Sequence, residues 1–218
     1  MPTIPRASGV AVFTVVLLIT AGCSNLRPAA APHPSYFSLD SSSAAAHEAR
    51  PDAQPGVLTL IVSPTRAASG FDNQRIAYVR QAHAIDYYAN NLWVDPPARM
   101  LGPLIVDVLG RNAIFRAVVT TPTTVAGDLR LETEILRLQH EFLQQPSVVR
   151  FTLRAQLVDN VTRKVIASRE FETVALAPSE NPYGGVIAAN KAVLKALEQV
   201  SVFCTETVGH GWKRETVK

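Results

Sequence analysis

The residue whose chemistry says most about this chain is Cys23, because its position makes the thiol a candidate for covalent modification. Arg6 precedes a mostly apolar run at 10–19, and the small residues at 20–22 lead directly to the cysteine. A basic residue, about ten apolar residues and a small-residue cleavage site are typical of a secretory signal peptide. The run is too short to cross a bilayer, which takes roughly 20 residues. The sequence therefore predicts that residues 1–22 are removed.

The segment Thr20-Ala21-Gly22-Cys23 resembles a bacterial lipobox, in which the cysteine thiol receives a diacylglycerol and the cysteine becomes the acylated first residue. Most lipoboxes carry Leu where this chain has Thr20. The alternative is an ordinary signal peptide with a chance cysteine. The lipobox resemblance implies three acyl chains, which hold a protein durably because each buried methylene contributes about 0.8 kcal/mol. Ser24 is not the aspartate that usually retains such proteins at the inner membrane, so the implied location is the periplasmic face of the outer membrane.

Histidines that could hold a metal or act as bases are scattered along the chain. None has a metal-like spacing to another His, Cys or acidic cluster. The five are His33, His47, His83, His140 and His210. His140 stands next to Glu141, but neighbouring residues of a strand point to opposite faces, so the pair cannot easily act together. We expect no metal, no cofactor and no catalytic histidine.

Three further motifs have both a chemical and a structural interpretation. Glu170 and Glu172 share one strand face and could perform acid/base chemistry, although a solvated outer face explains them as well. Gly184-Gly185 could present backbone N–H groups to an anion, or make a tight turn. The serines at 41–43 lack a nucleophile-elbow context. No phosphate loop or dinucleotide fingerprint is present, so the chain is not expected to be an ATPase or another enzyme.

The aromatic residues Tyr87, Tyr88 and Trp93 are the candidate contact residues for a partner or a lipid. Amphipathic aromatic side chains are enriched among the residues that dominate protein interfaces. The alternative is that they pack beneath a helix that begins near Pro96, and the two interpretations are compatible.

The charge balance and the cysteines limit the function classes. The whole chain has 21 basic and 18 acidic side chains, and loss of the signal peptide removes only one of them, Arg6. That balance is too even to indicate a nucleic-acid partner. With Cys23 acylated, Cys204 is the remaining thiol and no intramolecular disulfide can form. Cys204 lies on the apolar side of a helical pattern, which favours a buried small hydrophobe over a nucleophile or an intermolecular bridge.

The remaining patterns divide the chain into a signal peptide (1–22), a proline-rich tether (23–35), one domain (36–205) and a flexible tail (206–218). Alternating apolar and polar residues predict strands, and apolar residues at helical spacing predict helices. The aromatic and polar segment 84–91 is assigned no element. The expected strands are 36–39, 58–62, 75–80, 115–119, 129–142, 151–157 and 165–176, with a turn at 159–164 and helices after Asp95 and after Pro182.

Several short blocks follow the lipobox in order: YFSL at 36–39, IAYVR at 76–80, YYA at 87–89 with LWVDPP at 92–97, AQLVD at 155–159, and Gly185 with AANKA at 188–192. In order and spacing they resemble the ABC-type transport auxiliary lipoprotein family (PqiC/YmbA-like proteins). The resemblance extends from about Tyr36 to Phe203. It implies a three-layer α/β fold, with a mixed, roughly five-stranded sheet flanked by helices, related to the N-terminal domain of TolB.

The resemblance also implies a function. Such a protein would be a non-catalytic auxiliary component of an ABC/MCE-type intermembrane lipid transport system, docking the periplasmic conduit at the outer membrane. Its partners would be an MCE-domain protein and ABC transporter components, and it could assemble with copies of itself. Two alternatives remain open. One is a stand-alone periplasmic lipoprotein that binds a lipid or small molecule. The other is a periplasmic hydrolase, which requires a clustered nucleophile, base and oxyanion donors.

Overall fold

The computed structural model describes residues 33–40, 56–112, 114–209 and 212, and the fold is given for these residues. The predicted signal peptide, Cys23, Ser24, the serines at 41–43 and two of the five histidines (His47 and His210) lie outside them. None of the described helices is both long and apolar enough to cross a membrane.

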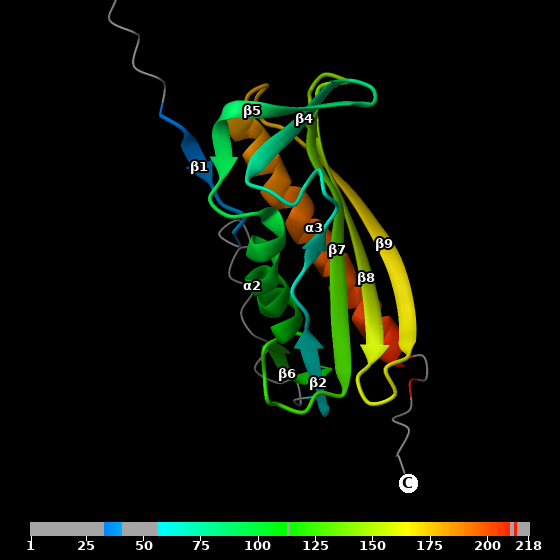
Figure 1. Cartoon of the computed structure of the whole chain (residues 1–218). Coiled ribbons are helices and arrows are strands. Elements are labelled where there is room, and N and C mark those ends of the chain that lie inside the picture. The colour runs from blue at the N-terminus through cyan, green and yellow to red at the C-terminus, as the bar shows by residue number, and fades with distance from the viewer. Residues whose placement is uncertain (1–32, 41–55, 113, 210–211, 213–218) are drawn as a thin grey trace, which may run out of the picture. The chain divides into compact units, whose positions relative to one another are not determined.

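A mixed, open sheet of nine strands forms the body of the domain (Figure 1). The strands are β1 (Ser35–Phe37), β2 (Leu58–Val62), β3 (Arg66–Ala67), β4 (Arg75–Gln81), β5 (Ala84–Trp93), β6 (Phe115–Thr120), β7 (Leu129–Glu141), β8 (Val148–Asp159) and β9 (Val165–Leu176). Two helices accompany them, α2 (Pro97–Gly110) and α3 (Pro182–Gly209). The order of elements interleaves strands and helices, as expected for an α/β domain.

Strand β7 is the centre of the sheet because both of its edges are paired. One edge runs antiparallel to β8, which in turn pairs antiparallel with β9. Along the other edge β2, β3 and β4 follow one another, all parallel to β7. Beyond β2 lies the parallel strand β6, and beyond β4 lie antiparallel β5 and then β1. Strand β7 therefore joins the antiparallel pair β8–β9 on one side to the strands β1–β6 on the other.

Period-2 alternation in the sequence produces the buried face of this sheet. In β7, Leu129, Leu131 and Ile135 are fully buried, whereas the residues between them, such as Arg130, face the other side. Their partners in β8 repeat the pattern, so the two strands contribute one apolar surface. Helix α3 packs against β7, β8 and β9, helix α2 packs against β2 and β6, and the two helices contact each other. The buried side chains of sheet and helices form one core.

Proline and asparagine residues mark where the two helices begin. Helix α2 begins with Pro97 in its first turn, where a missing N–H costs nothing. Helix α3 begins with Pro182, and the side-chain oxygen of Asn181 accepts a hydrogen bond from the backbone N–H of Gly184 at 2.8 Å. That bond satisfies one of the donors left free at a helix start.

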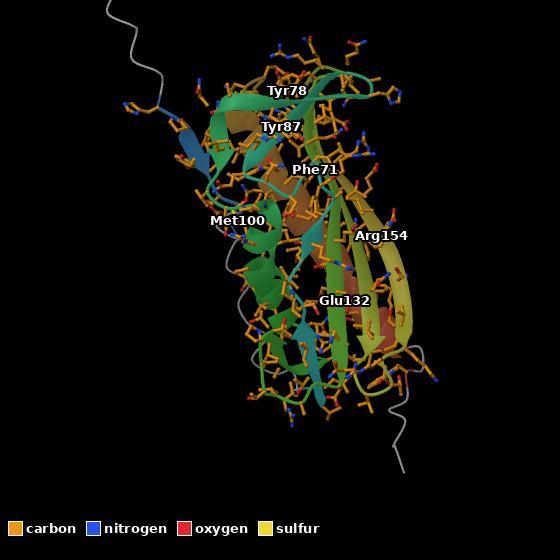
Figure 2. The ribbon with its side chains drawn as sticks, in the orientation of Figure 1. Phe71, Tyr78, Tyr87, Met100, Glu132 and Arg154 are labelled. Atoms are coloured by element: carbon orange, nitrogen blue, oxygen red, sulfur yellow. The ribbon has the colours of Figure 1, made fainter. Side chains whose placement is uncertain are left out.

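The observed architecture corrects two expectations. The sheet has nine strands, whereas the family resemblance implied about five and the sequence patterns predicted seven. The patterns missed β3, which has only two residues, and β5, which lacks a clear alternation of buried and exposed residues. The helices form one layer instead of two. On the opposite face of β7–β9, Glu134 pairs with Arg154. Figure 2 labels Arg154 and Glu132 on these strands, and no helix in the described ranges covers this charged face. The domain is thus a two-layer α/β structure there, and a likeness to the TolB domain stays a prediction.

The predicted elements at 58–62, 115–119, 129–142 and 165–176 are present with small shifts in their ends. The predicted turn at 159–164 is also present, and the Asp159 carboxylate accepts hydrogen bonds from the backbone N–H groups of Val161 and Thr162. The last helix continues to Gly209, beyond the expected domain end at 205. An ion pair between Arg169 of β9 and Glu206 lies in this extension.

Candidate functional site

Four rings gather at the end of the sheet where β4, β5 and β7 meet. The ring centroids of Tyr78 and Tyr88 are 4.6 Å apart, and those of His140 and Phe142 are 4.1 Å apart. Tyr78 and Phe142 meet edge to face at 6.3 Å. The guanidinium of Arg80 lies 5.2 Å from the Tyr78 ring centroid. We call Tyr78, Tyr88, His140 and Phe142 the ring cluster.

A chain of polar groups passes through the ring cluster and links four segments of the protein. The hydroxyl of Tyr88 lies 3.2 Å from Nδ1 of His140, whose Nε2 lies 2.8 Å from Oγ of Ser147. The backbone N–H of Ser147 donates to the carboxylate of Glu180 at 2.8 Å. Hydrogen bonds from the Ser147 N–H and from its hydroxyl lower the pKa of Glu180. Strand β5, strand β7, the β7–β8 loop and the segment before α3 are thereby joined.

The donors along this chain depend on the tautomer of His140. The Glu180 carboxylate can only accept, and it accepts the backbone N–H of Ser147. A neutral imidazole donates from one ring nitrogen and accepts at the other, so Tyr88 and Ser147 can satisfy both nitrogens of His140. His140 is neutral in this arrangement. Burial lowers the pKa of His140, with the negative Glu180 opposing the change.

Serine, histidine and glutamate side by side suggest a hydrolase, but the arrangement differs from a nucleophile with its base. A catalytic histidine removes a proton from a serine that a substrate can reach. Ser147 has no exposed surface, and His140 is 1 % exposed. Burial raises the pKa of Tyr88 to about 12, so its hydroxyl stays protonated as a donor. The geometry therefore supports a structural role in fixing the end of the sheet.

The glycine pair is a packing feature of this site. Gly184 and Gly185 lie inside α3 rather than in a tight turn before it, because the helix already begins at Pro182. A Cβ at position 184 would collide with the backbone of Ser179, and one at position 185 would lie 2.5 Å from Nδ1 of His140. Both glycines allow the helix to approach its neighbours closely. The pair is therefore neither the anion site nor the tight turn considered from the sequence.

The candidate contact residues have different surroundings. Trp93 is 3 % exposed and packs in the core, as the packing alternative expects. Tyr88 is half-buried and engaged with His140. Tyr87 is partly exposed; its hydroxyl donates to the carbonyl of Gly70 at 2.9 Å, and the Arg75 guanidinium lies 3.9 Å from its ring centroid. Contact with a partner stays a prediction, and of the three aromatic residues Tyr87 and Tyr88 are the ones that a partner could reach.

The paired glutamates lie on the outer face of the sheet, in contact with arginines. Glu172 pairs with Arg150 at 2.5 Å, and Glu170 pairs with Arg154 at 2.7 Å. Arg150 also pairs with Glu141 at 3.0 Å. Glu141 is only 5 % exposed. As expected from their adjacent positions, His140 and Glu141 have separate partners. These contacts account for both glutamates without acid/base chemistry.

The remaining candidates show no assembled site. His33 is exposed at the edge of the described residues, and His83 is exposed in the β4–β5 turn with a φ of 68°. Across the described ranges, no three His, Cys, Asp or Glu side chains are grouped so that they could hold a metal. Cys204 is fully buried in α3, and burial raises its pKa to about 12, which agrees with the packing interpretation.

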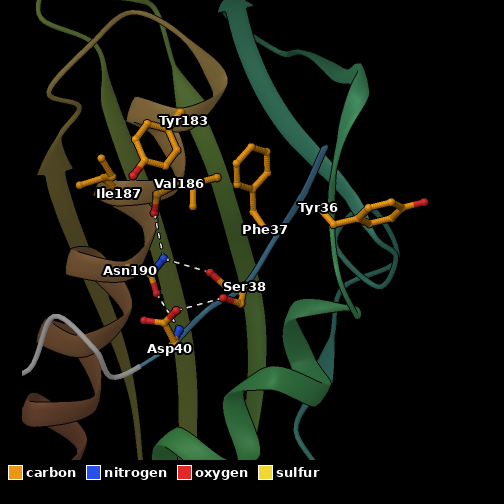
Figure 3. A pocket seen from close by; sticks show the side chains of 8 residues that line it. All are labelled: Tyr36, Phe37, Ser38, Asp40, Tyr183, Val186, Ile187 and Asn190. Atoms are coloured by element: carbon orange, nitrogen blue, oxygen red, sulfur yellow. Dashed lines mark hydrogen bonds between the residues drawn. The ribbon is translucent and has the colours of Figure 1, made fainter. Parts of the chain in front are cut away.

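A second polar junction fastens the first strand to α3. The side-chain oxygen of Asn190 accepts the backbone N–H of Asp40 at 2.8 Å, and its amide donates to the carbonyls of Ser38 and Val186, both at 3.1 Å. These residues border a cleft of about 300 Å³ between β1 and α3, in which Phe37 faces Tyr183 while Tyr36 points away (Figure 3). This junction sets where the chain enters the domain.

The sequence analysis missed the polar chain that ends at Glu180. Its members come from four segments separated by up to 92 positions, and none forms a recognisable local motif. The one available signal was the pattern of β7, which places His140 on the apolar face of a strand. A histidine there needs hydrogen-bond partners because unpaired buried polar groups are costly.

Comparisons with known proteins show which family and which solved structures this chain is similar to. The family model of the ABC-type transport auxiliary lipoprotein component matches residues 37–201. No curated protein matches the chain. A crystal structure from Xanthomonas campestris is similar at 19 % identity, with a TM-score of 0.65, covering 82 % of this chain and 96 % of that one.

A crystal structure of an uncharacterized protein is similar at 15 % identity, with a TM-score of 0.60, covering 81 % of this chain and 99 % of that one. At these identities the two structures show a shared fold. The match of the family model confirms the family expected from the sequence blocks, and it covers most of the described domain. The chain belongs to the ABC-type transport auxiliary lipoprotein family.

Proposed function

We propose that this protein is a non-catalytic outer-membrane lipoprotein of an ABC/MCE-type intermembrane lipid transport system, which docks the periplasmic conduit at the outer membrane. The family match over residues 37–201 carries the proposal, because members are auxiliary components of ABC-type transport. The partners are an MCE-domain protein and the ABC transporter components. Cys23 carries the lipid anchor and Ser24 directs the protein to the outer membrane.

The mechanism is positional. An acylated Cys23 fixes one end of the chain in the membrane, and the residues up to Pro34 set the reach of the domain at about 40 Å when extended. Strand β1 begins directly after them, and the Asn190 junction ties it to α3. A rigid entry point of this kind lets the anchor restrain the whole domain rather than a loose end.

The contact surface is proposed at β5, around Tyr87 and Tyr88. Tyr87 combines partial exposure with a fixed orientation, since Gly70 and Arg75 hold it from two sides. A rigid aromatic side chain loses little conformational entropy when a partner covers it. Ile85, two residues away in the same strand, is 45 % exposed and adds apolar area.

The test is site-specific photo-cross-linking in cells with the full-length protein. A photoreactive residue in place of Ile85 should capture an MCE-domain protein, while one in place of Val202, 55 % exposed on α3, should not. Equal capture at both positions would refute the contact surface. If neither position captures an MCE-domain protein and none co-purifies in mild detergent, the proposed function is wrong.

The alternative is a stand-alone lipoprotein that binds a lipid or small molecule without a transporter. An apolar cleft beside α2 favours it. It predicts that the phenotype of deleting this protein persists in cells that lack the transport system. Loss of that phenotype in such cells would exclude the alternative.

A further inference from the structure

A cleft of about 600 Å³ opens between the first half of α2 and the ends of β2 and β6. The two strands are parallel, with Val62 opposite Thr120, so their carboxyl ends lie together. Helix α2 precedes β6 in the chain and its N-terminal half borders the same end (Figure 1). The cleft has the volume of sites that hold small ligands in other proteins. It shares no residue with the ring cluster.

Missing side chains in α2 create this space. Ala98, Gly102 and Val106 follow one another at a spacing of four, so they form one narrow row along the helix. A Cβ built at Gly102 would meet nothing within 4 Å. Pro103, beside this row, has no N–H, so the carbonyl of Arg99 lacks its donor one turn later. The helix therefore has little side-chain bulk along this row, and its regular hydrogen-bond pattern is interrupted beside it.

The lining of the cleft is mostly apolar and also includes polar side chains and one charged side chain. Val62, Pro64, Ala98 and Val106 supply aliphatic surface, and Thr120 and Thr121 supply hydroxyl groups. The charged side chain among the lining residues is Arg99, which is mostly exposed. One of its nitrogens contacts the Asp95 carboxylate at 3.2 Å. A guanidinium has five N–H donors, so others can bind a second anion.

We propose that this cleft binds a single-chain amphiphile with an anionic head group. The aliphatic chain lies along Gly102 and Val106, and the head group binds Arg99 beside the threonine hydroxyls. The mostly apolar lining and the exposed guanidinium of Arg99 match that ligand. A soluble polar metabolite would fit less well, because its polar groups would meet apolar surface without hydrogen-bond partners. The site belongs to this chain alone and does not depend on docking to a transporter.

The test uses the full-length protein in native membranes and a fatty acid that carries a diazirine in its chain. We expect the label on α2 and on the residues after β6. Gly102→Leu fills the cleft and should reduce labelling at least about tenfold, since the loss of two buried methylenes already has that effect. Gly110→Leu is the matched control, because it lies in the same helix, has equally open space and does not border the cleft.

Both variants should fold, since leucine favours helix over glycine, and equal or higher melting temperatures would confirm it. Equal labelling of the two variants would overturn the proposal. The head group is tested with the corresponding fatty alcohol. Wild-type protein should prefer the acid by about threefold, as expected for a partly exposed charge pair, and Arg99→Gln should remove the preference. Equal labelling by acid and alcohol in the wild type would overturn the anionic part.

Discussion

The backbone of Gly185 lies directly against the imidazole of His140, so that a Cβ at position 185 would be 2.5 Å from Nδ1. The ring cannot turn away easily, because Tyr88 and Ser147 hold its two nitrogens. Helix α3 and strand β7 are therefore in contact at a point where a single methyl group is too large. The approach of the helix to the sheet and the polar chain through His140 depend on each other.

The first prediction concerns this contact. Gly185→Ala should destabilise the protein by about 1–3 kcal/mol, because overpacking forces a shift of the ring or the helix. Urea unfolding measures the change. Gly110→Ala, where a Cβ has open space, is the control and should be neutral or stabilising. In the His140→Ala background the cost of Gly185→Ala should shrink, and an unchanged cost would show that the ring is not the obstacle.

The second prediction is a pH dependence of stability. Burial lowers the folded-state pKa of His140, with Glu180 opposing, so the unfolded chain binds the proton more readily. The stability from a neutral His140 is fully present above about pH 6.5 and is lost as the pH falls through the folded-state pKa, by at most about 1.4 kcal/mol per pH unit. Unfolding between pH 7.5 and 5 measures it. His140→Gln should flatten the profile, and His83→Gln should not; identical profiles for all three proteins would contradict the assignment.

The third prediction separates two arginines on the same face of β8. Arg150→Ala should cost about 2–4 kcal/mol, because it leaves the buried carboxylate of Glu141 without its cation. Arg154→Ala should cost clearly less than Arg150→Ala, since its partners Glu134 and Glu170 are more exposed and solvent screens such pairs. Thermal or urea unfolding of both variants compares them directly. Similar costs would mean that burial of Glu141 does not matter.

The fourth prediction concerns the buried thiol. Cys204 should resist alkylation in the folded protein at pH 8, because it has no exposed surface and burial raises its pKa to about 12. It should react completely in denaturant. Val202→Cys in a Cys204→Ala background, two residues away on the exposed side of α3, should react rapidly in the native state. Fast labelling of native Cys204, or a disulfide-linked dimer, would favour the intermolecular alternative.

The fifth prediction tests the anchor. Cys23→Ser should leave the protein uncleaved at this site and without its attachment to the outer membrane, because serine offers no thiol for acylation. Membrane fractionation and mass spectrometry of the N-terminus measure both effects. Unchanged fractionation of the variant, or a wild-type mature chain without acyl groups, would refute the lipobox interpretation.

Local sequence patterns were sufficient where one face of an element is buried and the other is not. The alternation in β7 and β9 and the helical spacing in α2 predicted these elements close to their observed ends. Strand β5 was missed for a physical reason. Most of its residues are exposed or half-buried, so its hydrogen bonds to β4 and β1 hold it in the sheet without a periodic apolar face.

What the sequence by itself determined is the set of features that short segments encode: the signal-like N-terminus with Cys23, the family blocks and the main strands and helices. Only the tertiary structure decided that both helices share one face of the sheet and that Tyr88, His140, Ser147 and Glu180 form one chain. The reason is that hydrogen bonds and close packing depend on distances between segments remote along the chain. A pattern of residue types within one segment records which face is apolar, but not which partner covers it.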